Sequence, residues 1–154
     1  MIGDLVRFVN KENCEIVISG RTKHFLSLVG EHLSVDNMNK AVEYVAEQLN
    51  VEIPEFTVAG IPYEGSFAHH WFLGVNGNLD RTQAKLLLDK KLKELNDDYA
   101  VERVSALKEV IIDTLPAIKF YNYMSNNGRL GGQNKFPRVL KASQLEEWKQ
   151  YISS

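Results

Sequence analysis

Strand-like and helix-like segments alternate along most of this sequence, and that alternation limits the folds open to it. A helical segment is expected from Ser34 to about Asn50, and two β-rich runs follow at residues 56–61 and 70–75. We expect the first of these strands to be bounded by Pro54 and Pro62. Such alternation favours an α/β (α+β) fold, in which one small mixed sheet carries helices on both faces.

The second half of the chain continues the same pattern. We predict a helix over residues 80–95, a short helical piece over residues 99–103 and a strand over residues 109–114. Pro116 is then expected at the start of a helix that ends near Asn126, because proline is tolerated in the first helical turn. Gly128 follows as a typical helix stop.

One single polar residue and two pairs of polar residues predict where three helices begin. Ser34 is expected to be the N-cap of the first helix, and Asp80 with Gln83 has the spacing of a capping box. Ser143 and Glu146 have the same spacing before a last helix that carries Leu145, Trp148 and Ile152.

The N-terminus is expected to form a β-hairpin ahead of the α/β body. Its strands are predicted at residues 5–9 and 14–19, with residues 10–13 as the connecting loop. Because a two-stranded hairpin is only marginally stable alone, it must pack on something else.

Composition narrows the functional class. The chain has 154 residues, which suits one domain, and its net charge of -2 gives no basic field for nucleic acid. No apolar run approaches the roughly 20 residues of a membrane span. The single cysteine, Cys14, excludes an internal disulfide framework and favours a reducing, cytoplasmic location.

The stretch from Gly128 to Arg138 is the strongest candidate for a functional loop. Gly128, Gly131 and Gly132 permit positive φ and close backbone approach, and Lys135 follows them directly before a stiffer Phe-Pro segment. A lysine ammonium beside exposed backbone N–H groups suits a phosphate or a carboxylate. An ordinary surface loop of the same composition is the alternative interpretation.

Three stretches, in their order along the chain, resemble the C-terminal part of the adenylate-forming enzymes. More narrowly, the chain is similar to bacterial relatives of the plant auxin-responsive acyl acid–amido synthetases, and the similarity runs from Gly3 to about Leu140. The stretches are Gly3-Asp4-Leu5-Val6-Arg7, then Ser19-Gly20-Arg21-Thr22-Lys23 with Gly30-Glu31, and finally Gly131-Gly132-Gln133-Asn134-Lys135-Phe136-Pro137-Arg138.

The resemblance implies a ligase that uses ATP and Mg²⁺ to join a carboxylic acid to an amino acid. It implies that Asp4 binds the ribose hydroxyls of ATP, and that Arg21 lies near the nucleotide at a hinge with Lys23 as the pivot. It implies a catalytic role for Lys135, which would bridge the phosphate and the carboxylate oxygen during adenylation. A carboxylate acceptor suits two hydroxyls, and a cation suits the charge that develops on phosphorus.

The same resemblance implies a partner, because the phosphate-binding loop and acyl pocket are expected upstream of Gly3, in an N-terminal adenylation domain. Residues 1–154 would then form one C-terminal lid domain, with hairpin and hinge at residues 1–22 and the α/β body at residues 23–154. We expect either a fragment of a longer protein or a separately encoded domain, inactive alone. The alternative is a non-catalytic binding or assembly module that kept this fold.

Other reactive side chains point to structure rather than chemistry. His69 and His70 are adjacent on a predicted strand and should point to opposite faces, so no metal site is predicted. Cys14 lies in a β-rich run without an obvious base, which favours a structural thiol.

Overall fold

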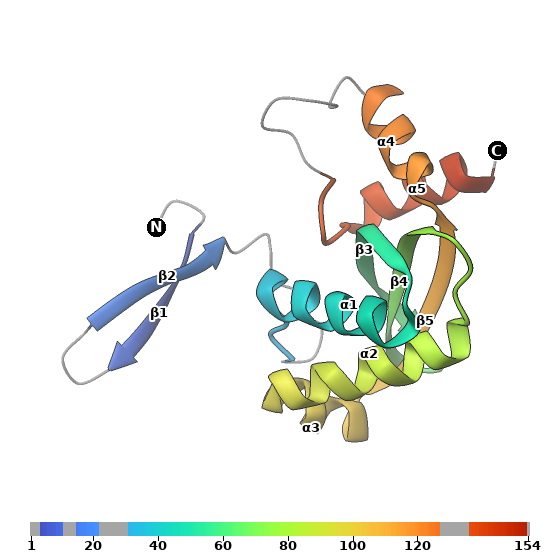
Figure 1. Ribbon diagram of the computed structural model, residues 1–154. Helices are drawn as coiled ribbons and strands as arrows, with labels where there is room; N and C mark the ends of the chain where they lie inside the picture. Colours follow the sequence, from blue (N-terminus) through green and yellow to red (C-terminus); the bar gives the residue numbers. More distant parts are fainter. Residues whose placement is uncertain (1–3, 11–14, 22–30, 127–135, 154) are drawn as a thin grey trace.

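Three strands form the mixed sheet at the centre of the α/β body (Figure 1). The computed structural model describes residues 4–10, 15–21, 31–126 and 136–153. Strand β3 (Glu52–Tyr63) pairs antiparallel with β4 (Ser66–Asn76), and β4 pairs parallel with β5 (Leu107–Pro116). Glu64 and Gly65 form a two-residue turn between β3 and β4, with φ of 45° and 76°, as a tight hairpin requires.

Helices cover both faces of this sheet. Helices α2 (Arg81–Leu95) and α3 (Asp97–Ser105) form the crossover that the parallel pair needs, and they share one hydrophobic core with α1 (Val35–Leu49). Helices α4 (Ala117–Asn126) and α5 (Ala142–Ser153) form a second core on the other face. The predicted fold class is therefore confirmed. None of the described helices has the length and apolar character needed to cross a membrane.

Alternate residues of the central strand supply the two cores. Trp71 and Leu73 belong to the core under α1, α2 and α3, whereas Phe72 belongs to the core under α4 and α5. Gly74 allows α4 to approach closely, because a Cβ atom there would lie 2.7 Å from the ring of buried Phe120. The middle of β4 is thus enclosed on both sides.

The N-terminal strands pair with each other and form a separate two-stranded sheet. Strand β1 (Asp4–Asn10) runs antiparallel to β2 (Glu15–Arg21), with register irregularities after Leu5 and after Phe8. The predicted hairpin is confirmed, while Cys14 and residues 11–13 of the predicted loop lie outside the described residues.

Ser34 and Asp80 are the N-caps of α1 and α2, as expected, and α1 also has the reciprocal bond of a capping box. The Ser34 hydroxyl accepts a hydrogen bond from the Asn37 N–H at 3.0 Å, and the Asn37 side chain accepts one from the Ser34 N–H at 3.3 Å. The Asp80 carboxylate accepts bonds from the N–H groups of Thr82 and Gln83. Local sequence therefore sets both helix starts.

The structure corrects the predicted positions of three prolines. Pro54 and Pro62 lie inside β3 rather than at its ends, and Pro116 is the last residue of β5 rather than the first of α4. Both strands are at the edges of the sheet, where a missing N–H need not break the ladder. The irregular register between Glu52 and Glu55 accommodates Pro54.

The predicted cap of the last helix is also wrong. Helix α5 begins at Ala142, so Ser143 lies inside its first turn. The Lys141 carbonyl already accepts from the Leu145 N–H at 2.8 Å, and the Gln144 side chain accepts from the Lys141 N–H at 2.9 Å. Gln144 thus supplies the reciprocal bond that Glu146 was expected to make. The predicted helix stop, Gly128, lies outside the described residues.

Candidate functional site

The four predicted site residues divide between described and undescribed parts of the chain. Asp4 begins β1 and Arg21 ends β2, and the register of the hairpin makes these two residues Cα partners. Asp4 and Arg21 therefore lie side by side at the open end of the hairpin, although most of its residues separate them in sequence. Lys23 and Lys135 lie outside the described residues.

The described residues directly after Lys135 are fixed to the edge of the sheet. The Val58 N–H donates to the Arg138 carbonyl at 2.9 Å, and the Leu140 N–H donates to the Val58 carbonyl at 2.9 Å. These bonds form a parallel bridge between Val58 and Val139. The segment of residues 136–140, which we call the anchor segment, therefore covers part of the outer edge of β3.

A buried hydroxyl adds a side-chain contact to this anchor. Thr57 has no exposed surface, and its Oγ1 donates to the Pro137 carbonyl at 2.8 Å, with the Arg138 carbonyl at 3.3 Å. Pro137 has no N–H, so its carbonyl is the backbone group through which it can be held. Thr57 thereby fixes the chain two residues beyond Lys135.

Arg138 turns toward β3 and forms an ion pair there. Its Nη1 donates to the Glu55 carboxylate at 2.6 Å and to the Phe56 carbonyl at 3.0 Å. The guanidinium carbon lies 4.4 Å from the centre of the Phe56 ring, in a cation–π arrangement. Arg138 is thus engaged by the sheet.

Aromatic packing holds the first residue of the anchor segment. Phe136 is 4% exposed, and its ring centre lies 4.9 Å from Trp148 of α5 and 4.8 Å from Phe120 of α4. It also lies 5.7 Å from Tyr123, near the end of α4. The two described segments that flank residues 127–135 therefore pack against one another.

These contacts fix the position of the anchor segment, but they do not form a complete set of catalytic groups. Backbone bonds, a hydroxyl, an ion pair and an aromatic cluster all fix the chain immediately after Lys135. Thr57 and Glu55 were not predicted from the sequence, because they lie some 80 residues away from their partners. No local spacing in the sequence could have identified them.

The two adjacent histidines have separate carboxylate partners on the two sides of β4. His69 is fully buried with Nε2 2.6 Å from a Glu31 carboxylate oxygen, while His70 Nε2 lies 2.7 Å from Asp113. The His70 ring stacks on Phe72 at 4.2 Å. Among the described residues, no group of three or more His, Cys, Asp or Glu is placed to hold a metal ion.

A third polar cluster joins α2 and α3. The Asp89 carboxylate accepts bonds from the Tyr99 hydroxyl at 2.6 Å and from Arg103 Nε at 2.8 Å. Burial raises the pKa of Asp89, but the hydrogen bonds and charge of its partners outweigh burial and hold that pKa below its ordinary value. Burial, together with the Asp89 charge, raises the pKa of the Tyr99 hydroxyl. These hydrogen bonds connect α2 to α3.

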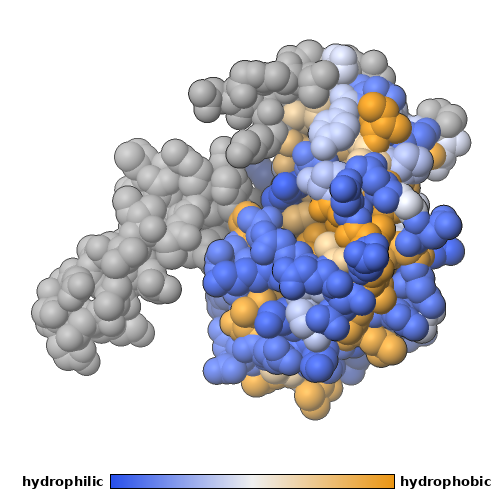
Figure 2. Space-filling model, in the orientation of Figure 1, coloured by the Kyte–Doolittle hydropathy of each residue, from blue (hydrophilic) through white to orange (hydrophobic). Residues whose placement is uncertain are grey.

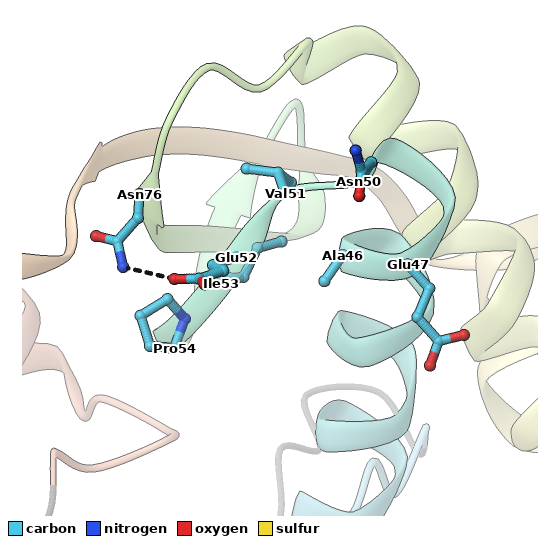
Figure 3. A pocket seen from close by; sticks show the side chains of 8 residues that line it. All are labelled: Ala46, Glu47, Asn50, Val51, Glu52, Ile53, Pro54 and Asn76. Atoms are coloured by element: carbon cyan, nitrogen blue, oxygen red, sulfur yellow. Dashed lines mark hydrogen bonds between the residues drawn. The ribbon is translucent and has the colours of Figure 1, made fainter.

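Two surface features contain none of the predicted site residues. Figure 3 shows an open hollow between the end of α1 and the start of β3, where Asn76 donates to Glu52 at 3.2 Å. Figure 2 shows a largely hydrophilic face with hydrophobic residues at its lower edge, where α3 lies in Figure 1. Val101 and Val104 of α3 are 61% and 85% exposed.

Comparison with known proteins identifies the fold. Residues 36–144 match the GH3 family C-terminal domain. The structure of a GH3.15 acyl acid amido synthetase aligns over 99% of this chain and 30% of its own, with 18% identity and a TM-score of 0.70. The AtGH3.15 acyl acid amido synthetase in complex with 2,4-DB aligns over 97% of this chain and 30% of its own, with 17% identity and a TM-score of 0.67. No curated protein sequence matches the chain significantly.

The structural alignments show that this chain is similar to a part of such proteins, and the family match identifies the C-terminal domain. The chain spans about 30% of the length of the two solved proteins. Because its identity to them is only 18% and 17%, this similarity shows a shared fold and nothing more. The family match covers more than half of the chain, and it confirms the resemblance drawn from the three sequence stretches. The chain therefore belongs to the GH3 family and contains its C-terminal domain.

Proposed function

We propose that this chain is the C-terminal lid of an ATP-dependent, acyl-adenylating amido synthetase that conjugates a carboxylic acid to an amino acid. The observation that carries the proposal is the anchor segment, which fixes the chain directly after Lys135 on a domain shared with acyl acid amido synthetases. Because the anchor segment is fixed to the sheet, Lys135 would lose less conformational entropy when it binds a charged group.

The proposed reaction has two half-reactions. In adenylation, a carboxylate oxygen bonds to the α-phosphorus of ATP, and the bond from that phosphorus to pyrophosphate breaks. In transfer, the amino nitrogen of the amino acid bonds to the acyl carbon, the bond from that carbon to AMP breaks, and the nitrogen loses a proton. The Lys135 ammonium would stabilise the negative charge that develops on the phosphate oxygens during adenylation.

The remaining predicted residues would bind the nucleotide or serve as the pivot. Asp4 would accept hydrogen bonds from the ribose hydroxyls, and Arg21, its Cα partner in the hairpin, would lie near the same nucleotide. Lys23 would be the pivot between hairpin and body. Mg²⁺ would accompany ATP in the full-length enzyme.

The proposed partner is an N-terminal adenylation domain that binds ATP and the carboxylic acid. Residues 1–154 would close over it as one domain, with the hinge in residues 1–22 and the body in residues 23–154. The acid and amino acid are the substrates of the joined enzyme, which we place in the cytoplasm, with neither nucleic acid nor membrane as a partner.

The proposal is tested by Lys135→Ala in the full-length enzyme, or in a mixture of its two domains. We expect adenylation, measured by pyrophosphate exchange, to fall about a hundredfold or more, because a charge-assisted contact in a closed site contributes roughly 3 kcal/mol. Transfer from a preformed acyl-adenylate should be nearly unchanged. Exposed Lys141→Ala is the matched control and should leave both half-reactions within a few-fold of the wild type. A Lys135→Ala enzyme with wild-type adenylation would refute the proposed role.

A further inference from the structure

A buried pair of ionisable side chains ties the start of the α/β body to its central strand. Glu31 and His69 both have side chains with no exposed surface, and their closest atoms, Oε2 and Nε2, lie 2.6 Å apart. His69 belongs to β4, the middle strand of the sheet. Glu31 lies 38 residues earlier, in the four described residues that precede α1.

These four residues, 31–34, form what we call the junction segment, and each of them has its own attachment. The His32 carbonyl accepts a bond from the Asn96 side chain at 3.1 Å, and Leu33 is fully buried in the first core. Ser34 caps α1. These contacts fix the start of the body at Glu31. The hairpin is joined to the body by the part of the chain that precedes this residue.

The chemistry of the pair indicates positioning rather than stability. Removing two polar groups from water is costly, and a buried ion pair can often be replaced by apolar residues without loss of stability. What such a pair adds is direction, because a contact of 2.6 Å between Oε2 and Nε2 depends on both distance and angle. A purely apolar contact would permit the segment to shift or rotate.

We propose that Glu31 and His69 are positioning residues for the two half-reactions of the amido synthetase, an inference that rests on the function proposed above. Their contact fixes the body side of the connection between hairpin and body. The hairpin, which carries Asp4 and Arg21, is thus joined to a body whose first described residues have a fixed position.

The test replaces the pair by apolar residues of similar volume, as Glu31→Met/His69→Phe. We expect this double variant to melt close to the wild type, because the cost of burying the two polar groups disappears with their attraction. In the full-length enzyme, the ratio of the adenylation rate to the transfer rate should change about tenfold or more. Glu31→Gln retains a side-chain oxygen that can bond to His69 and should keep the ratio within about threefold.

The neighbouring pair provides a matched control. His70 of β4 and Asp113 of β5 lie 2.7 Å apart, but their side chains are 12% and 43% exposed. His70→Phe/Asp113→Leu should leave the ratio of the two rates unchanged. The inference is refuted if the Glu31/His69 double variant folds and keeps the wild-type ratio. It is equally refuted if that variant fails to fold, since the pair would then be needed for stability.

Amide hydrogen exchange tests the inference independently of catalysis. In the printed chain, the Glu31→Met/His69→Phe variant should exchange the amides of Leu33 and Ser34 about fivefold faster or more, while amides in β4 stay as protected as in the wild type. Unchanged exchange at the junction segment would overturn the inference. A wild-type enzyme that lacks both half-reactions would instead refute the proposed function and leave this measurement valid.

Discussion

Asp89 shows how one carboxylate can hold two helices together at the residue scale. It is 15% exposed and accepts bonds from Tyr99 and Arg103, both of which come from α3. Removing one member of such a buried cluster leaves the others without a partner, which costs more than the cluster itself contributes.

We predict that Asp89→Asn lowers the free energy of unfolding at neutral pH by about 1–3 kcal/mol. Because the pKa of Asp89 is lower in the folded protein, its contribution is fully present above its ordinary pKa near 4 and is lost as the pH falls through the folded-state value. The difference between wild type and variant should therefore shrink below about pH 4. Denaturant unfolding at pH 7 and pH 3 measures both quantities.

Asp36 offers the control for this prediction. Its side chain is 71% exposed and lies 3.1 Å from Lys40 one turn along α1. Asp36→Asn should change stability by less than about 0.5 kcal/mol, because exposed ion pairs contribute little. If both variants lose the same stability, the Asp89 cluster has no special role.

At the element scale, the anchor segment is joined to β3 across a long separation in sequence. Thr57 is fully buried on β3, and its hydroxyl holds the Pro137 carbonyl while the backbone of Val58 bonds on both sides of Val139. The contact between the two elements is therefore both a source of stability and a constraint on the position of residue 136.

We predict that Thr57→Val lowers stability by about 1–2 kcal/mol, because the Pro137 carbonyl loses its hydroxyl partner while the shape of the side chain is kept. In the full-length enzyme, adenylation should fall several-fold and transfer should fall less. Thr57→Ser keeps the hydroxyl and should retain more of the adenylation rate than Thr57→Val. If the valine variant adenylates as fast as wild type, the anchor segment does not position Lys135.

At the scale of the whole molecule, the size of the chain relative to its solved relatives is the main constraint. The chain covers about 30% of the length of the matched amido synthetases, and its described residues supply positioning groups rather than a complete catalytic set. The lid proposed above would need the surface on which it closes.

We predict that the 154-residue chain, purified alone, folds cooperatively but catalyses neither pyrophosphate exchange nor amino acid conjugation. The physical reason is that the proposed ATP and acyl sites lie in the N-terminal domain. Circular dichroism during thermal unfolding checks the first part, and exchange assays with a panel of carboxylic acids check the second. Robust pyrophosphate exchange by this chain with any carboxylic acid would refute the proposal that the ATP and acyl sites lie in the N-terminal domain.

Features that depend on residues close together in the chain could mostly be predicted from the sequence. Ser34 and Asp80 mark helix starts because capping bonds join residues only two or three positions apart. The alternation of strands and helices predicted the fold class, and three ordered motifs predicted the family. The errors at Pro54, Pro62, Pro116 and Ser143 arose where an edge position in the sheet, or a carbonyl one residue before the helix, overrode local preference.

Only the tertiary structure decided which distant residues support the candidate site. Thr57 lies 80 residues from Pro137, and Glu31 lies 38 residues from His69, so no periodicity or spacing links them. Their partners are set by the order of strands in the sheet and by which face each side chain occupies. These properties depend on long-range pairing, because backbone bonds and burial are satisfied by the fold as a whole rather than by neighbours in sequence.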